Sequence, residues 1–249
     1  MRIFDALVRV FDIEKTWKSF VVDLLFFFVL SAVLGLLSIK ELIGQNLLVL
    51  SDTLVQQSAT LKFSELIFNS VNFQKILLLL GVAALVTYPL YCLFHGWLWK
   101  YAALMKGKEY RVKRFFLANI FWFPLFCLWV VLDFMLSYFD TVAQRMEPGT
   151  FPLLGTVSGV LFLLILYFAL LSYGLLSKEK VGNVGRAFLL GFKKPGFRFA
   201  LALLIVVAVM FLIVSLSTIS FWLFLVLTYI SYPILMLWLR FVALDAVET

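Results

Sequence analysis

Few side chains in this sequence could do acid–base chemistry inside its long apolar runs. His95 is the only histidine, and it stands in TYPLYCLFHGWLWK, residues 87–100. Asp23 and Asp133 are carboxylates within other apolar runs. Ionisable groups in such surroundings are costly, so each is a candidate for a functional role. A histidine that meets an aspartate could sense pH or close an entrance, because imidazole titrates near neutral pH.

The position of each group along its run predicts which groups can meet. A helix rises about 1.5 Å per residue, so Asp23 lies roughly 7 Å inside its run and Asp133 roughly 27 Å along its own. His95 lies five residues before the basic residue that ends its run. We therefore predict that Asp23 and His95 lie at one membrane face as a candidate inner-mouth pair. The alternative interpretation is an interfacial histidine, because Trp97 and Trp99, which follow it, favour the headgroup level.

Catalytic and metal-binding patterns are missing from the sequence. One histidine cannot supply H-E-x-x-H, and GTVSGV around Ser158 lacks the spacing of G-x-S-x-G. Asp23 and Asp133 are predicted at opposite faces, so they cannot share a site as a carboxylate pair. The two cysteines lie in apolar runs and, with one histidine, form no zinc, haem or iron–sulfur pattern. We expect no catalytic residue, no cofactor and no metal, and a protein that is not an enzyme.

Composition determines which elements must position these residues. The chain has 249 residues, of which 64% are hydrophobic and 14% charged, a balance that a soluble domain cannot cover with polar surface. Six apolar runs of about 20 residues are long enough to cross the bilayer as helices. The predicted spans are 19–39, 76–99, 115–138, 153–176, 198–217 and 219–240. We predict an all-α polytopic membrane bundle of six transmembrane helices, with residues 1–249 forming one membrane domain.

Positive charge is distributed unevenly across the predicted spans. Seventeen of the 21 Lys and Arg residues fall on one side, in the N-terminal arm, the second and fourth loops, and at Arg240, which ends the sixth predicted span. Cytoplasmic loops retain Lys and Arg, so we expect both termini in the cytoplasm, in a prokaryotic plasma membrane. No nucleic-acid-binding motif accompanies these charges. We expect the basic loops to contact anionic lipid headgroups and not nucleic acid.

Two cytoplasmic segments have helical amphipathic patterns. In the arm 1–18, charged residues recur every three or four positions opposite an apolar face, which predicts an interfacial helix over 1–16. In the loop 177–197, the stretch VGNVGRAFLLGFKKPGF sets apolar residues at four-residue intervals beside basic ones, which predicts a helix over about 182–194. Each helix could lie on the membrane surface or dock a partner.

The outer loop 40–75 is the longest segment between spans. Its leucines and isoleucines repeat at three and four residues, and the pattern resumes after Ser58. We predict two short amphipathic helices, which could lie on the outer leaflet, cap their own bundle or bind a neighbouring subunit. Other membrane subunits, or a second copy of this chain, are therefore expected partners.

Similar segments recur along the chain. The second and sixth spans both contain Tyr-Pro and leave the membrane as WKYAAL and LRFVAL, in keeping with three repeated helical hairpins. The six spans, with GRAFLLGFKKPGFRF before the fifth, resemble six-span prokaryotic and archaeal membrane families that include the membrane domain of some bacterial glycerophosphodiester phosphodiesterases. The resemblance carries over no functional residue, and it implies no enzyme activity, because the phosphodiesterase barrel of those proteins has no counterpart here.

Prolines near the middle of three spans could open a pocket, because each removes a backbone hydrogen bond and can kink its helix. Hydroxyl-bearing residues flank them. The candidate pocket residues are Tyr88, Pro89, Pro124, Tyr229, Tyr232 and Pro233. The alternative is structural, because prolines are common in membrane helices and tyrosine hydroxyls often join helices.

Two functions follow as expectations from these patterns. The broad aromatic and amphipathic surface, with no catalytic set, favours a non-catalytic membrane scaffold or accessory subunit that packs against lipids or other subunits. The alternative is a small transporter or lipid-handling protein that uses the proline-kinked pocket.

Overall fold

We describe a computed structural model of the chain. It describes residues 10–11, 13–38, 71–146, 151, 153–178 and 184–248, and the single positions 6, 8, 41, 42, 45, 46 and 49. Most of the arm 1–18 before residue 13 and most of the outer loop 40–75 lie outside the described residues, so the helices predicted there stay predictions.

The described residues form helices joined by short turns and connections, with no strand among them, which confirms the predicted all-α fold. Its elements are α2 (Ile13–Leu36), α5 (Val71–Met105), α6 (Val112–Met146), α7 (Leu153–Leu175), α8 (Val184–Gly191), α9 (Lys194–Ser215), the 3-10 helix η1 (Leu216–Thr218) and α10 (Phe221–Ala246). Within the described ranges, six segments are long and apolar enough to cross a membrane: Thr16–Leu36, Val71–Met105, Val112–Ser137, Leu153–Leu175, Lys194–Thr218 and Phe221–Ala246. The chain is an integral membrane protein with six candidate spans.

The chain forms two compact units. The first contains Met1–Leu24 and Cys92–Thr249, and the second contains Leu25–Tyr91. Helices α2 and α5 each contribute to both units. The buried polar cluster around Arg240 belongs to the first unit.

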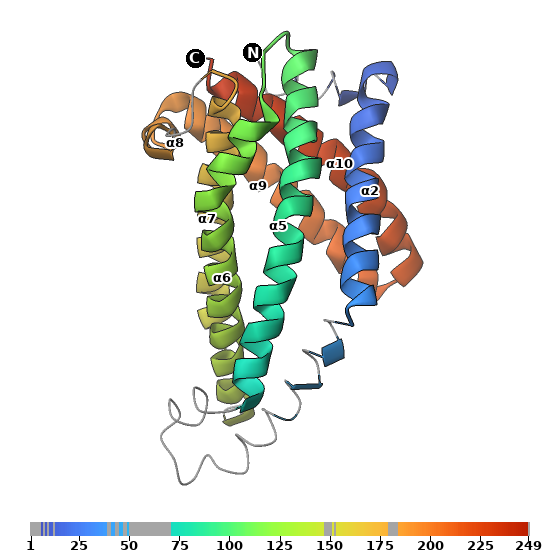
Figure 1. Cartoon of the computed structure of the whole chain (residues 1–249), viewed down its shortest axis with the longest axis vertical. Helices are drawn as coiled ribbons and strands as arrows, with labels where there is room; N and C mark the ends of the chain where they lie inside the picture. The colour runs from blue at the N-terminus through green and yellow to red at the C-terminus, as the bar shows by residue number, and fades with distance from the viewer. Residues whose placement is uncertain are drawn as a thin grey trace. The chain divides into compact units, whose positions relative to one another are not determined.

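The first unit is built around α7, which contacts α6, α8, α9 and α10. Figure 1 shows α6 and α7 running side by side along their length. The last two turns of α7 are buried from Ala169 to Leu175, and the last two turns of α10 are buried from Leu237 to Leu244. The core of this unit therefore lies where the C-terminal ends of these two helices meet.

Specific residues define the helix ends in this unit. Gly107 has φ of 67° and follows α5, where the Lys108 amide donates to the Ala103 carbonyl at 2.9 Å; only glycine adopts this left-handed backbone without strain. The Ser220 side chain caps α10 by accepting from the Leu223 amide at 3.3 Å. Pro195 stands in the first turn of α9, where a missing amide costs nothing.

The corner between α8 and α9 depends on a second glycine. Gly196 is buried, and a Cβ built there would overlap the carbonyl oxygens of Leu190 and Gly191. These obstacles are backbone atoms, which cannot move aside as a flexible side chain can. The helix predicted over about 182–194 is present as α8, and this close contact turns the chain into α9.

Candidate functional site

A buried arginine organises the polar site of the first unit. Arg240 lies on α10, and its guanidinium donates to both carboxylate oxygens of Asp23 on α2, with Nη1–Oδ2 at 3.0 Å and Nη2–Oδ1 at 3.2 Å. Asp23 is 0% exposed and Arg240 is 1% exposed. This two-point pairing is the strongest geometry available to an arginine and a carboxylate, and it ties together helices that lie 217 residues apart in the chain.

His95 on α5 completes the cluster. Its Nδ1 lies 3.2 Å from Nη2 of Arg240, and the side chain is 5% exposed. A guanidinium can only donate, so Nδ1 must accept the hydrogen bond, and the imidazole is neutral with its proton on Nε2. We call Asp23, His95 and Arg240 the buried triad. Arg240 carries the positive charge, Asp23 carries the negative charge, and His95 is neutral.

The predicted pair of Asp23 and His95 therefore meets through a third residue. The two side chains lie in the same cluster, and each binds Arg240. The hydropathy pattern predicts that Arg240 ends the sixth span. In the structure α10 continues to Ala246, and residues 241–244 are buried, so Arg240 lies inside the helix. The signal that could have revealed this is the apolar FVAL that follows Arg240.

Aromatic side chains and an amide surround the C-terminal end of α7 in the same unit. The Tyr173 hydroxyl donates to Oδ1 of Asn119 at 2.7 Å, and Asn119 donates to the Phe115 carbonyl at 2.9 Å. Trp99 contacts Tyr173 edge-on, with ring centroids 5.9 Å apart. Asn119, Phe115 and Tyr173 are all buried. These contacts satisfy a buried amide and a buried hydroxyl while joining α5, α6 and α7.

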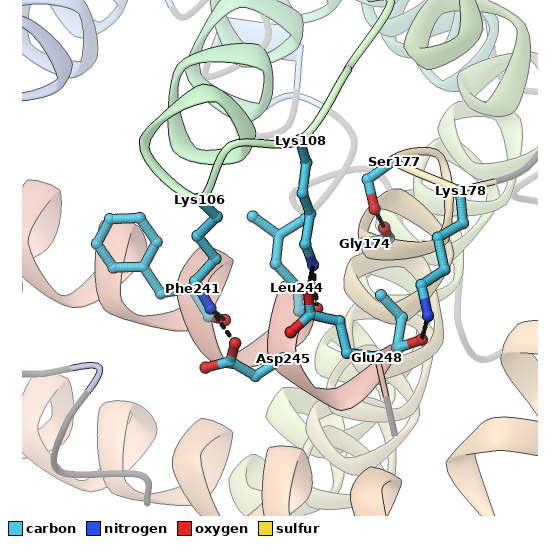
Figure 2. Close-up of polar contacts among 10 residues, drawn as sticks. Lys106, Lys108, Gly174, Ser177, Lys178, Phe241, Leu244, Asp245 and Glu248 are labelled. Atoms are coloured by element: carbon cyan, nitrogen blue, oxygen red, sulfur yellow. Dashed lines mark hydrogen bonds and ion pairs between the residues drawn. The ribbon is translucent and has the colours of Figure 1, made fainter. Parts of the chain in front are cut away.

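Three lysines cap the C-terminal end of α10 (Figure 2). Lys106 donates to the Phe241 carbonyl at 2.9 Å and pairs with Asp245. Lys108 donates to the Leu244 carbonyl at 2.8 Å, and Lys178 donates to the Val247 carbonyl at 2.7 Å. A helix leaves its last carbonyls without intrahelical partners and carries partial negative charge at this end. We call these three residues the lysine cap.

The lysine cap contains two ion pairs: Lys106 with Asp245 is mostly buried, and Lys108 with Glu248 is more exposed. Burial lowers the pKa of Lys106, and the hydrogen bond and charge of Asp245 partly offset this effect. The hydrogen bond from Lys108 lowers the pKa of Glu248, whose side chain is half exposed and lies 2.8 Å from the ammonium nitrogen. The basic second loop therefore has an internal role, because its lysines neutralise a helix end and two carboxylates.

The remaining intramembrane carboxylate, Asp133, joins α6 to α7. The Ser158 hydroxyl donates to Oδ1 of Asp133 at 2.7 Å, and the Trp129 indole donates to the Ser158 hydroxyl at 3.1 Å. Two turns further along α6, Asp140 accepts from the backbone amides of Leu154 and Gly155, the latter at 2.6 Å. Asp140 thus neutralises the positive N-terminal end of α7.

The candidate pocket residues are divided between the two units. Tyr88 and Pro89 belong to the second unit, whereas Pro124, Tyr229, Tyr232 and Pro233 belong to the first. Within the first unit, Pro124 and Tyr229 are exposed and Pro233 is buried. These four residues do not share one environment, and the pocket itself stays a prediction. The helices α5, α6 and α10 continue through their prolines.

Comparison with known proteins gives no match for this chain. No protein-family model, no curated protein and no solved structure is similar to it. Any function must therefore be argued from the residues and contacts above.

Proposed function

We propose that the protein is a non-catalytic membrane scaffold or accessory subunit, which packs its apolar helical surface against lipid and against other membrane subunits. The observation that carries the proposal is that the charged side chains of the first unit bind other helices of the same unit. Asp23, Asp133 and Arg240 each bind a neighbouring helix, and Asp140, beyond the candidate span of α6, binds the N-terminal end of α7. Their contacts stabilise the bundle.

The outward surface supports the same proposal. In the most apolar stretch of each candidate span, no more than 33% of the residues are buried. On α9 and α10, Phe211 and Trp222 are 71% and 75% exposed. Lipid tails alone can cover such surfaces, and rigid aromatic side chains also suit contacts with other helices. The amphipathic α8 adds an exposed Phe188 and Leu189 at the edge of the unit.

The resemblance to six-span membrane families and the cytoplasmic position of both termini are parts of the same proposal. A prokaryotic plasma membrane is the location that the resemblance implies, and the concentration of basic residues on one side of the spans supports the cytoplasmic termini. The proposal assigns no catalytic residue and no cofactor.

Site-specific photo-crosslinking in native membranes tests the proposal. A photoreactive phenylalanine analogue is placed at Phe211 or at Trp222, and a matched control carries it at Glu109, which is exposed between α5 and α6. We expect one protein adduct of constant mass at Phe211 or Trp222 and none at Glu109. Native mass spectrometry of the gently extracted protein should then show the same partner at a fixed ratio.

Two outcomes would contradict the proposal. Adducts to lipid alone, together with a protein that purifies without a partner, would remove the accessory role. Retention of one defined metabolite by the isolated protein would favour the alternative, a transporter that uses the proline-containing spans.

A further inference from the structure

A groove in the first unit lies between the N-terminal part of α2 and the C-terminal part of α5. Its volume is about 400 Å³, within the range of about 300–1,000 Å³ that is typical of ligand sites. Aromatic and aliphatic side chains form most of its wall. The lining residues are Trp17, Lys18, Ser19, Val21, Val22, Trp97, Leu98 and Tyr101.

Two lysines place positive charge at or beside this groove: Lys18 lines it, and Lys100 lies next to the lining residue Trp97. The Lys18 ammonium lies 5.8 Å from the centre of the Trp17 ring, and the Lys100 ammonium lies 5.1 Å from the centre of the Trp97 ring. In the described part of the chain, no ion pair joins either lysine to a carboxylate. By contrast, Lys106 and Lys108 in the nearby lysine cap are neutralised by Asp245 and Glu248. The rim of the groove therefore carries uncompensated positive charge.

One polar group in the groove wall has no intramolecular partner. Ser19 is 2% exposed, and its hydroxyl forms no hydrogen bond with the described residues. A buried hydroxyl without a partner costs free energy. A ligand oxygen that entered the groove would satisfy it, so the groove combines an apolar wall, a buried donor and two cations.

We propose that this groove binds one anionic phospholipid, with an acyl chain against Val22, Leu98 and the tryptophan rings and the headgroup phosphate between Lys18 and Lys100. The Ser19 hydroxyl donates to an ester or phosphate oxygen of the lipid. Half-exposed tryptophans beside lysines are typical of the membrane interface, where the phosphate of a lipid lies. The inference deepens the proposed packing against lipid by naming the lipid class and its site.

Lipid titration followed by native mass spectrometry tests this site on the full-length purified protein. Dioleoyl phosphatidylglycerol is compared with dioleoyl phosphatidylcholine, which has the same chains and no net charge. We expect one phosphatidylglycerol to bind about thirtyfold more tightly than phosphatidylcholine, because each of the two lysines contributes about fivefold to the affinity for an anionic headgroup. Glycerol phosphate, which lacks acyl chains, should fail to compete at the same concentrations.

Matched variants assign the binding to the groove. Lys18→Gln with Lys100→Gln should abolish the preference for phosphatidylglycerol. Lys113→Gln with Lys194→Gln removes the same charge from exposed positions outside the groove and should retain the preference. Ser19→Ala should weaken binding of both lipids about two- to fivefold, since one hydrogen bond is lost.

Three outcomes would overturn the site. Equal binding of the two lipids would remove the charge recognition, and loss of preference in the control pair would make it an effect of overall charge. Competition by glycerol phosphate would show a headgroup site without acyl contact. The lipid titration uses the isolated protein and needs no partner subunit. A negative result there is therefore distinguishable from a failure to capture a partner in the crosslinking experiment.

Discussion

At the scale of single residues, the buried triad of Asp23, His95 and Arg240 places two opposite charges in the interior, where an unpaired charge is costly. Removing either charge leaves the other buried without its counter-charge, which costs far more than the pair contributes. Replacing both with apolar side chains removes the cost of desolvating two ions. The triad therefore holds α2, α5 and α10 in one arrangement, because any other arrangement separates the charges.

A mutant cycle measures this coupling. We expect Arg240→Met alone to lower the free energy of unfolding by about 3–5 kcal/mol, because it leaves Asp23 charged and buried. The double variant Asp23→Leu with Arg240→Met should be less destabilised than either single variant. His95→Ala should cost about 0.5–1.5 kcal/mol, and this cost should disappear once Arg240 is Met.

Equilibrium unfolding in mixed micelles supplies these values. The control is Lys113→Met, which removes an exposed cation of α6 and should change stability by about 0.5 kcal/mol or less. Simple additivity of the Asp23 and Arg240 substitutions would show that the two side chains do not interact in the folded protein.

At the scale of elements, helix ends are neutralised by charged side chains from other elements. Asp140 binds the N-terminal end of α7, and the lysine cap binds the C-terminal end of α10. Both arrangements place opposite charge against the partial charge of a helix end. The loop between α5 and α6 thereby ties the last element of the chain to its second and third spans.

The ion pair of Lys108 with Glu248 predicts that the stability of the folded protein depends on pH. The pKa of Glu248 is lowered in the folded protein by the hydrogen bond from Lys108. Its contribution to stability is therefore fully present above the ordinary glutamate pKa, and it is lost as the pH falls through the lowered value. Because Glu248 is half exposed, we expect a small contribution of about 0.2–1 kcal/mol.

Thermal unfolding at pH 7 and in the acid range checks this prediction. Glu248→Gln should lower the midpoint at pH 7, and it should have no effect once the pH lies below the lowered pKa. Glu109→Gln, an exposed carboxylate without an ion pair in the described structure, is the control. An equal effect of Glu248→Gln at both pH values would show that the link to Lys108 contributes nothing.

At the scale of the whole molecule, the even number of candidate spans predicts that both ends of the chain lie on the same side of the membrane. The distribution of Lys and Arg further predicts that this side is the cytoplasm. The triad, the lysine cap and the lipid groove all belong to the first unit and lie near the span ends that carry most of the positive charge. Recognition of lipid or of a partner is therefore expected to be concentrated at that face.

Reporter fusions test the orientation. A fluorescent protein fused after Thr249 should fluoresce, and alkaline phosphatase fused at the same place should be inactive, because each folds on one side only. Phosphatase inserted into the 147–150 segment between α6 and α7 should be active. Activity of the C-terminal phosphatase fusion would show that the orientation, or the number of spans, is wrong.

The sequence by itself determined the environment and the elements. Length and uniform apolarity are sufficient to predict six spanning helices, because the bilayer admits little else. The depths of Asp23 and His95 predicted that they lie at the same level, since depth depends only on residue count along a helix. The amphipathic pattern of VGNVGRAFLLGFKKPGF likewise predicted α8, although its bounds differ by a few residues.

Only the tertiary structure decided which groups meet. Lys100 and Arg240 occupy matching places in WKYAAL and LRFVAL, yet Lys100 lies beside the groove and Arg240 is buried against Asp23. Composition along the chain cannot separate these outcomes, because a charge near a span end can face water, lipid or a neighbouring helix. The packing of α10 against the other helices decides this, through contacts between residues more than 100 positions apart.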